Sequence, residues 1–242
     1  MIEIIDVHKS FGRKVVLDGV TTNIEDGKTT VFIGPSGCGK STIMKIILRL
    51  VEPDTGQILL NGDDIAKFNN KKLDQFRAKS AMVFQAAALF DSLSIWENVG
   101  FALLERENKK PDEVRAIASE KLKAVGLEGS EDLYPSELSG GMQKRAAIAR
   151  AIAQDPDLIF YDEPTTGLDP ITSTVIEDLM KKIQVEMGIT SVIVTHQHST
   201  IFNCADIITM FHKGKVYKTG LPDEFKTSED ELIKNFIEGK VE

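Results

Sequence analysis

The stretch from Gly34 to Ser41 reads Gly-Pro-Ser-Gly-Cys-Gly-Lys-Ser, and it constrains the fold of this chain more than any other feature. It fits the pattern G-x-x-x-x-G-K-[ST], in which glycines allow backbone N–H groups to wrap a phosphate. The β-branched run 29–33 before it is typical of a buried strand, and residues 42–49 after it are typical of a helix. The sequence therefore predicts an α/β fold in which a strand turns into a helix N-terminus at a phosphate-binding loop.

The residues of this loop have expected contacts to a nucleotide and its metal ion. We expect Lys40 to bring its ammonium group to the β- and γ-phosphates of ATP, and Ser41 to place its hydroxyl on Mg²⁺. The helix dipole adds about half a positive charge at the same point. The predicted phosphate-binding residues are Gly34, Pro35, Ser36, Gly37, Cys38, Gly39, Lys40, Ser41 and Thr42.

Length, charge and cysteine content limit the classes of protein that remain. The 242 residues, 42% of them hydrophobic, suffice for one large α/β domain or two small ones. The net charge is −8 and the basic residues are scattered, so we expect no nucleic-acid partner. Cys38 and Cys204 do not make a disulfide framework, and a thiol in a nucleotide loop suits a reducing compartment. No apolar run approaches the roughly 18 residues of a membrane span, and residues 1–6 do not resemble a signal peptide. Any membrane role is therefore expected to come through a partner.

The residues before the phosphate-binding loop predict antiparallel structure. Residues 2–7, 15–17 and 20–24 read as three short strands. Phe11 stands among polar residues between the first two. Its ring either stacks on an adenine or packs under a turn, and this pattern leaves both open.

The middle of the chain changes character after the predicted strand 81–84. Gln85 ends that strand, where a glutamine in a nucleotide-binding protein can reach Mg²⁺ or the attacking water. From residue 86 to about 133 the periodicity is helical, without strands, which predicts an inserted helical subdomain. Its opening, Ala86–Leu104, carries more apolar surface than a small subdomain readily buries. Most of these residues are expected in the core, and the rest are expected to form a docking groove for a partner helix.

A second glycine-bearing helix N-terminus follows this insert. Ser139, Gly140 and Gly141 precede an alanine-rich helix, and such an end can hold a phosphate. Two anion sites for one ATP would be redundant within a monomer. We therefore expect the second site to cap an ATP that is bound to another copy of the chain.

Polar side chains follow two apolar strands in the last third of the chain. Asp162 and Glu163 end the strand 158–163, and His196 follows the strand 190–194. Ligands of open α/β sheets collect at the carboxyl ends of strands. We expect Asp162 to hold Mg²⁺ through water, Glu163 to orient or deprotonate the attacking water, and His196 to approach the γ-phosphate.

These elements together resemble a known family over nearly the whole chain. Gly34–Ser41, Gln85, Leu138–Met142, Leu158–Glu163, Gly167–Asp169 and His196 resemble, in order, the Walker A, Q-loop, signature, Walker B, D-loop and H-loop of ABC transporter ATPase subunits. The resemblance implies one domain over residues 1–242, a P-loop NTPase of the ABC type. Its RecA-like core with an antiparallel β subdomain would take residues 1–85 and 136–242, and its helical subdomain residues 86–135.

The same resemblance implies how ATP and Mg²⁺ are held. Two copies would pair head to tail around two ATP molecules, each between the Walker A loop of one copy and Ser139–Gly141 of the other. Phe11 then matches the aromatic residue that stacks on adenine, with Val16 beside the ring and Asp169 also at the nucleotide. Gln85, with Ser41 and Asp162, would serve Mg²⁺, and Lys40, Glu163 and His196 would serve catalysis.

Narrower features resemble the ATPases of Mla-type phospholipid transporters and related plastid lipid importers. They are Met142 after the signature glycines, Gln85 followed by Ala88-Leu89-Phe90, Asp169–Thr172, and the closing Asn235–Gly239. Such an ATPase would lie peripherally on the cytoplasmic face of the inner membrane. It would bind a permease near Ala86–Leu104 and, through it, an MCE-domain protein.

Two departures from the general family and three other functions also enter the prediction. Gln197 stands where the family usually has Asp, and Gly167 replaces a common Ala; both leave the chemistry intact and bear on coupling within the dimer.

An ATPase of an amino-acid or lipoprotein-related transporter is the alternative function, because an ATPase subunit touches no substrate. A soluble ABC ATPase acting on DNA or ribosomes is disfavoured by the short insert and acidic charge, and a non-hydrolysing sensor by the presence of Glu163 and His196.

Overall fold

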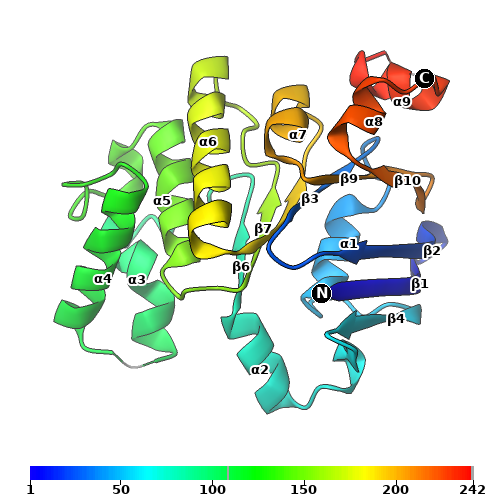
Figure 1. The fold of residues 1–242 in the computed structure, drawn as a ribbon. Coiled ribbons are helices and arrows are strands. Elements are labelled where there is room, and N and C mark those ends of the chain that lie inside the picture. Colours follow the sequence, from blue (N-terminus) through cyan, green and yellow to red (C-terminus); the bar gives the residue numbers. More distant parts are fainter. Residues whose placement is uncertain (108, 241–242) are drawn as a thin grey trace.

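The computed structural model describes residues 1–107 and 109–240. The predicted domain 1–242 and helical subdomain 86–135 also contain Asn108, Val241 and Glu242, which lie outside the described residues. Within the described part the strands form two sheets, with helices around the larger one (Figure 1). This arrangement confirms the predicted α/β class.

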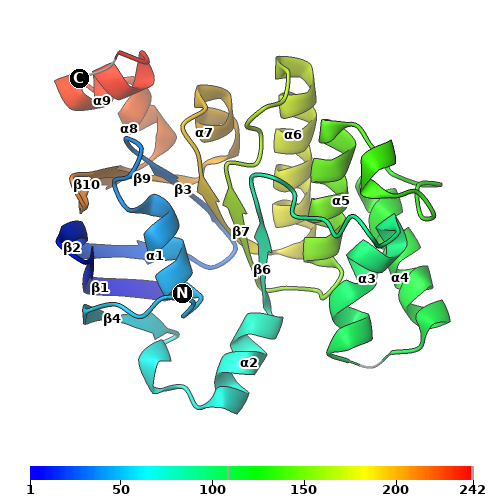
Figure 2. The same ribbon diagram turned by 180° about the vertical axis from the view of Figure 1, so that it is seen from behind.

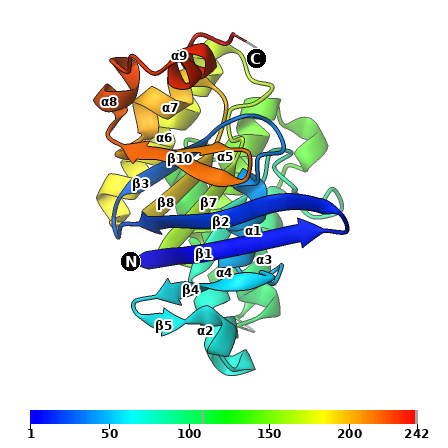
Figure 3. The same ribbon diagram turned by 90° about the vertical axis from the view of Figure 1, so that its right-hand side faces the viewer.

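The smaller sheet is antiparallel and has the strand order β2-β1-β4-β5. It consists of β1 (Ile2–Phe11), β2 (Lys14–Ile24), β4 (Thr55–Leu60) and β5 (Asp63–Asp64). The expectation of three short strands before residue 25 was wrong, because residues 14–24 form one strand that pairs with β1 through several register shifts. Figure 3 shows β1 and β2 as two long strands side by side.

The larger sheet has the order β10-β9-β3-β8-β7-β6. Its strands β3 (Thr29–Ile33), β8 (Thr190–Val194), β7 (Leu158–Asp162), β6 (Ser80–Val83) and β9 (Ile207–His212) pair in parallel. Only β10 (Lys215–Gly220) runs antiparallel, as the partner of β9 in the predicted hairpin. Parallel strands end at one edge of the sheet, so residues that follow β3, β6, β7 and β8 meet there.

Alternate residues of the larger sheet enter two separate hydrophobic clusters. Phe32, Phe160 and Val194 pack with helix α1 (Lys40–Ile47) and the small sheet. Val31 and Tyr161 pack with α5 (Gly140–Ile152), α6 (Pro170–Met187) and α7 (His198–Cys204) on the other face. Figures 1 and 2 show these two layers from opposite sides.

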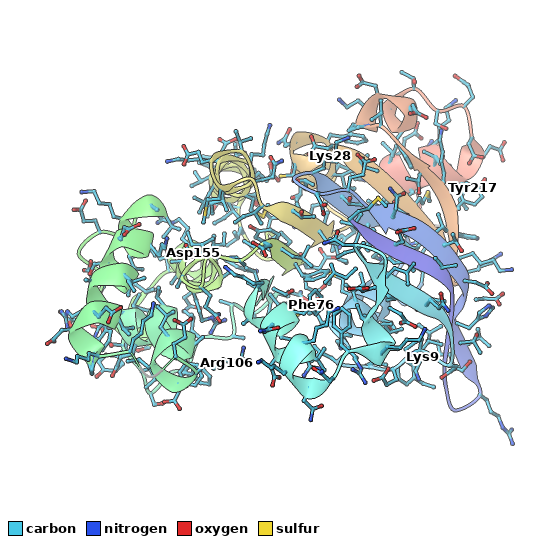
Figure 4. All side chains as sticks on the ribbon, turned by 60° about the horizontal axis from the view of Figure 1, so that its bottom comes forward. Lys9, Lys28, Phe76, Arg106, Asp155 and Tyr217 are labelled. Carbon is cyan, nitrogen blue, oxygen red and sulfur yellow. The ribbon has the colours of Figure 1, made fainter. Side chains whose placement is uncertain are left out.

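The described residues of the predicted insert form helices joined by turns and loops, and none of them lies in a strand. The insert contains α3 (Ile95–Glu105) and α4 (Pro111–Ala124), which pack with α5, followed by the short 3-10 helix η2 (Pro135–Glu137). Asp155, labelled in Figure 4, ties this region to the sheet. Its carbonyl accepts from Lys79 Nζ at 2.9 Å, and its carboxylate accepts from Lys121 Nζ of α4 at 3.0 Å.

The remaining helices lie at the edges. The 3-10 helix η1 (Ile65–Lys67) and α2 (Asn70–Ala78) link the two sheets, and α8 (Pro222–Lys226) and α9 (Glu231–Ile237) end the chain as expected. Among the described residues, none of the helices has the length and apolar character that crossing a membrane requires.

Candidate functional site

The phosphate-binding loop joins β3 to α1 as the sequence predicts. Gly34 has φ 136°, and a Cβ there would lie 2.2 Å from the carbonyl oxygen of Phe211 on β9. Only glycine fits such a position, because the backbone is left-handed and the neighbouring strand leaves no room. The loop thus presents the N-terminal end of α1 at the carboxyl edge of the sheet.

Lys40 is the first residue of α1 and lies inside this loop. It is 9% exposed, and its Nζ donates to the carbonyl oxygens of Gly34 at 2.6 Å and Pro35 at 3.0 Å. Its Nζ also lies 3.7 Å from Cys38 Sγ. The ammonium is therefore centred in the loop, where an incoming phosphate oxygen would replace a carbonyl as its partner.

A cavity of about 310 Å³ joins this loop to the small sheet. Its lining is Phe11, Lys14, Val16, Gly37, Gly39, Lys40, Ser41 and Thr42. Phe11 is 52% exposed at the end of β1, with Lys9 Nζ 5.4 Å from the centre of its ring. The cavity thus combines an aromatic ring, an aliphatic side chain and an anion cradle, which are the groups that a nucleotide requires.

Asp162 ends β7 directly beside the loop. Ser41 Oγ donates to Asp162 Oδ1 at 3.3 Å, which places the hydroxyl and the carboxylate at one point. Burial raises the pKa of Asp162, with the hydrogen bond from Ser41 opposing the shift. Hydroxyl and carboxylate oxygens are ligands that Mg²⁺ accepts alongside phosphate oxygens, so these two residues fit the predicted metal. No cluster of three or more His, Cys, Asp or Glu suited to a metal occurs among the described residues.

Glu163 follows with a left-handed backbone, φ 49°. Its carboxylate lies 2.8 Å from His196 Nδ1 and accepts from Thr166 Oγ1 at 3.1 Å and Thr195 Oγ1 at 3.3 Å. Because a carboxylate only accepts, His196 Nδ1 carries the hydrogen of that contact. The strained backbone and these three donors hold the Glu163 carboxylate at the sheet edge where the other ligands collect.

Gln85 occupies an exposed turn two residues beyond β6. Its carbonyl accepts from Lys144 Nζ at 2.5 Å, and the same ammonium lies 3.4 Å from the carbonyl of Glu163. Within the described residues no hydrogen bond joins the Gln85 side chain to Ser41 or Asp162. Its predicted role at the metal stays a prediction.

The second predicted anion site lies elsewhere in the same chain. Ser139 caps α5, its Oγ accepting from Met142 N at 3.3 Å. Figures 1 and 2 both show α1 and α5 at separate positions along the sheet. Gly141 has a packing role as well, because a Cβ there would lie 2.5 Å from Thr172 Cγ2 of α6.

Asp169 caps α6 rather than lining the cavity. Its Oδ1 accepts from Thr172 N at 3.0 Å and its Oδ2 from Thr172 Oγ1 at 2.5 Å. These hydrogen bonds lower the pKa of its carboxyl. Its predicted contact with the nucleotide stays a prediction.

Sequence reasoning missed the residues that support these groups. Arg150 of α5 donates to the carbonyls of Ala88 at 2.6 Å and Ala87 at 2.7 Å, both residues being left-handed with φ 51° and 58°. Burial lowers the pKa of Lys144, with Glu163 opposing the shift. No periodic pattern in the sequence marks Arg150 or Lys144. The hydroxyl residues Thr166 and Thr195 do lie beside the predicted motifs, and that position could have indicated hydrogen bonds to Glu163.

Comparison with known proteins agrees with this geometry. The family model described as ABC transporter matches residues 17–166. The chain is 42% identical over 259 residues to the chloroplastic protein TRIGALACTOSYLDIACYLGLYCEROL 3 of Arabidopsis thaliana, covering 100% of this chain and 74% of that one. It is 39% identical over 240 residues to the intermembrane phospholipid transport system ATP-binding protein MlaF of Haemophilus influenzae, covering 99% and 91%.

A solved structure of similar fold is the dimeric post-hydrolysis state of the ATP-binding cassette MJ0796 bound to ADP and Pi. The match has a TM-score of 0.81 and 34% identity, and it covers 92% of this chain and 99% of that one.

Proposed function

The chain belongs to the ABC transporter family as an ATP-hydrolysing subunit, and we propose that its transporter moves phospholipid between membranes. The observation that carries the proposal is the similarity to MlaF along almost the full length of both chains. An Arabidopsis relative at 42% identity bears a glycolipid in its own name, which supports a lipid cargo in general.

The residues around the cavity suit the binding of ATP. Phe11 stacks on the adenine with Val16 beside it, while the loop and Lys40 hold the phosphates. Ser41 and Asp162 would hold Mg²⁺, with Gln85 as a further ligand. The metal neutralises charge on the phosphate oxygens during transfer.

Hydrolysis then depends on Glu163 and His196. The Glu163 carboxylate is the base that orients and deprotonates water, and His196 is kept beside it by the 2.8 Å contact. Since His196 is 62% exposed at its side chain, its ring borders the space where a γ-phosphate would lie.

A second copy of the chain completes each site. Ser139, Gly140 and Gly141 present a helix end that no ATP of the same chain would reach, and they cap the ATP of the other copy. The solved cassette with 34% identity is dimeric, which supports this arrangement.

Coupling to transport requires a permease that docks on the segment Ala86–Leu104. Phe84 at 42% and Phe90 at 44% are exposed aromatic residues beside and within this segment. Their rings suit a helix of an integral membrane protein. The subunit then lies peripherally at the cytoplasmic face of the inner membrane, where ATP is supplied, and reaches an MCE-domain protein only through the permease.

The test is affinity purification of the tagged chain from membranes in mild detergent, with identification of bound proteins and lipids. A multi-span permease, an MCE-domain protein and phospholipid are expected together, and all three should be lost from the matched variant Phe90→Glu. Recovery of a periplasmic solute-binding protein without phospholipid would overturn the lipid cargo and leave the ATPase unaffected.

A further inference from the structure

A carboxylate that takes no part in nucleotide binding is fully buried behind the ATPase site. Glu177 lies in the middle of α6 and is 0% exposed. Its Oε1 accepts from Ser199 Oγ at 2.9 Å and Thr200 Oγ1 at 2.7 Å, and its Oε2 from Asn203 Nδ2 at 2.7 Å. All three donors lie on α7, which begins two residues after His196. A buried charge is retained only when hydrogen bonds compensate it, so Glu177 fixes α7 against α6.

Hydrogen bonds continue from this carboxylate to the catalytic one. Thr200 Oγ1 lies 2.8 Å from Thr165 Oγ1, which lies 2.9 Å from Oε1 of the Gln197 amide. The backbone N–H of Gln197 donates to Thr195 Oγ1 at 3.0 Å. Thr195 Oγ1 in turn donates to Glu163 Oε2 at 3.3 Å. The described residues thus link Glu177 to Glu163 through two loops, one on each side of the site.

The direction of the hydrogen atoms follows from what each group can donate. The carboxylate of Glu177 can only accept, so Thr200 gives it its single hydroxyl hydrogen. Thr165 then donates to Thr200 and has no hydrogen left for Gln197. The oxygen and nitrogen of the Gln197 amide must therefore be exchanged, so that its NH₂ faces Thr165, an orientation that the hydrogen-bond network assigns.

We propose that Glu177 is a positioning residue for ATP hydrolysis, which acts through Thr200 and Thr165 to hold the Thr195–Gln197 loop in register with Glu163. The proposal depends on ATP hydrolysis alone and is independent of the cargo. It also explains Gln197, which stands where the family usually has Asp. A network that ends on a buried carboxylate needs a donor at position 197, and Asp has none.

Two matched variants separate positioning from plain stabilisation. Ser199→Ala and Thr200→Val each remove one hydrogen bond to the same oxygen of Glu177, but only Thr200 connects to Thr165. We expect Thr200→Val to lower kcat for ATP about tenfold, the effect of one lost charge-assisted hydrogen bond at the site, with KM unchanged. Ser199→Ala should keep kcat within about twofold of the unchanged chain, a difference below 0.5 kcal/mol.

The measurements are steady-state phosphate release and thermal melting on the full-length chain, with Glu186→Gln as an exposed carboxylate control on α6. Glu177→Gln alone should lower kcat, but in a double variant with Thr200→Val it should cause no further loss. The effects of residues in one hydrogen-bond network are not additive. Equal kcat losses in Ser199→Ala and Thr200→Val would overturn the proposal.

A variant at the other end of the network keeps the proposal testable if Thr200→Val does not fold. Gln197→Glu retains the length of a partly exposed side chain but cannot donate to Thr165. We expect the same loss in kcat at constant KM. Unchanged kcat in Gln197→Glu would contradict the assigned direction of the network and with it the proposal.

Discussion

Replacement of Glu163 by Gln tests the chemistry of the site most directly. Gln keeps the length of the side chain, and its Oε1 can still accept from His196 Nδ1 at the 2.8 Å position. The hydroxyls of Thr166 and Thr195 can rotate to accept from the new NH₂ group. We therefore expect Glu163→Gln to fold normally while it loses the base for the attacking water.

The expected loss is large because the base acts only in the transition state. General-base catalysis contributes about 10²- to 10⁴-fold in rate, or about 3 to 5 kcal/mol of barrier. Affinity for ATP should be unchanged, since Phe11, Lys40 and the rest of the cavity lining do not include Glu163. Bound ATP that is not hydrolysed should also keep two copies together.

Phosphate release, nucleotide binding and size-exclusion chromatography with ATP measure these three effects. Glu186→Gln makes the same change on an exposed residue and should match the unchanged chain in all of them. Normal turnover in Glu163→Gln would remove Glu163 from its catalytic role. Loss of ATP binding would show that the carboxylate organises the nucleotide site rather than the water.

Three further changes test other parts of the site. Burial raises the pKa of Asp162 above its ordinary 3.8, so the folded state favours the protonated carboxyl. The stability that this carboxyl contributes is therefore full below pH 3.8, and it is lost as the pH rises through the raised pKa of the folded state. Asp162→Asn should accordingly raise the melting temperature at neutral pH while abolishing Mg²⁺-dependent turnover; a lower melting temperature would contradict the shift. Alkylation of Cys38 by N-ethylmaleimide should inactivate the ATPase, and saturating ATP should slow it; labelling at equal rates would show that the loop does not close over nucleotide. A charge at Phe90, which is 44% exposed, should abolish permease binding and leave ATP hydrolysis by the isolated chain, whereas Val185→Glu, at 74% exposed, serves as the control. The same charge at Leu89 is expected to disturb folding, because Leu89 packs against the core.

The phosphate-binding loop was predictable because its chemistry is local. Gly34 needs a left-handed backbone and Lys40 must follow the turn, so a short pattern specifies the loop and the strand and helix beside it. Asp162 and Glu163 were predicted only together with this loop, because two carboxylates at the end of an apolar strand are by themselves an ordinary polar strand end.

Strand length in the small sheet was not predictable in this way. Val15–Leu17 and Val20–Ile24 belong to one strand, because β2 pairs along β1 through register shifts that the local alternation does not reveal. Pairing between strands decides such lengths, and it depends on the partner more than on the propensity of the strand itself.

The sequence by itself determined the α/β class, the anion-binding loop and the order of the polar residues along the chain. Only the tertiary structure decided which of them meet. Parallel pairing of β7 with β8 brings Thr195 and His196 onto Glu163, some thirty positions away in the chain. Packing of α7 on α6 places Glu177 under both loops, and no periodic pattern signals a buried carboxylate whose donors lie on another helix. Such contacts depend on how the sheet orders its strands, which is a non-local property of the chain.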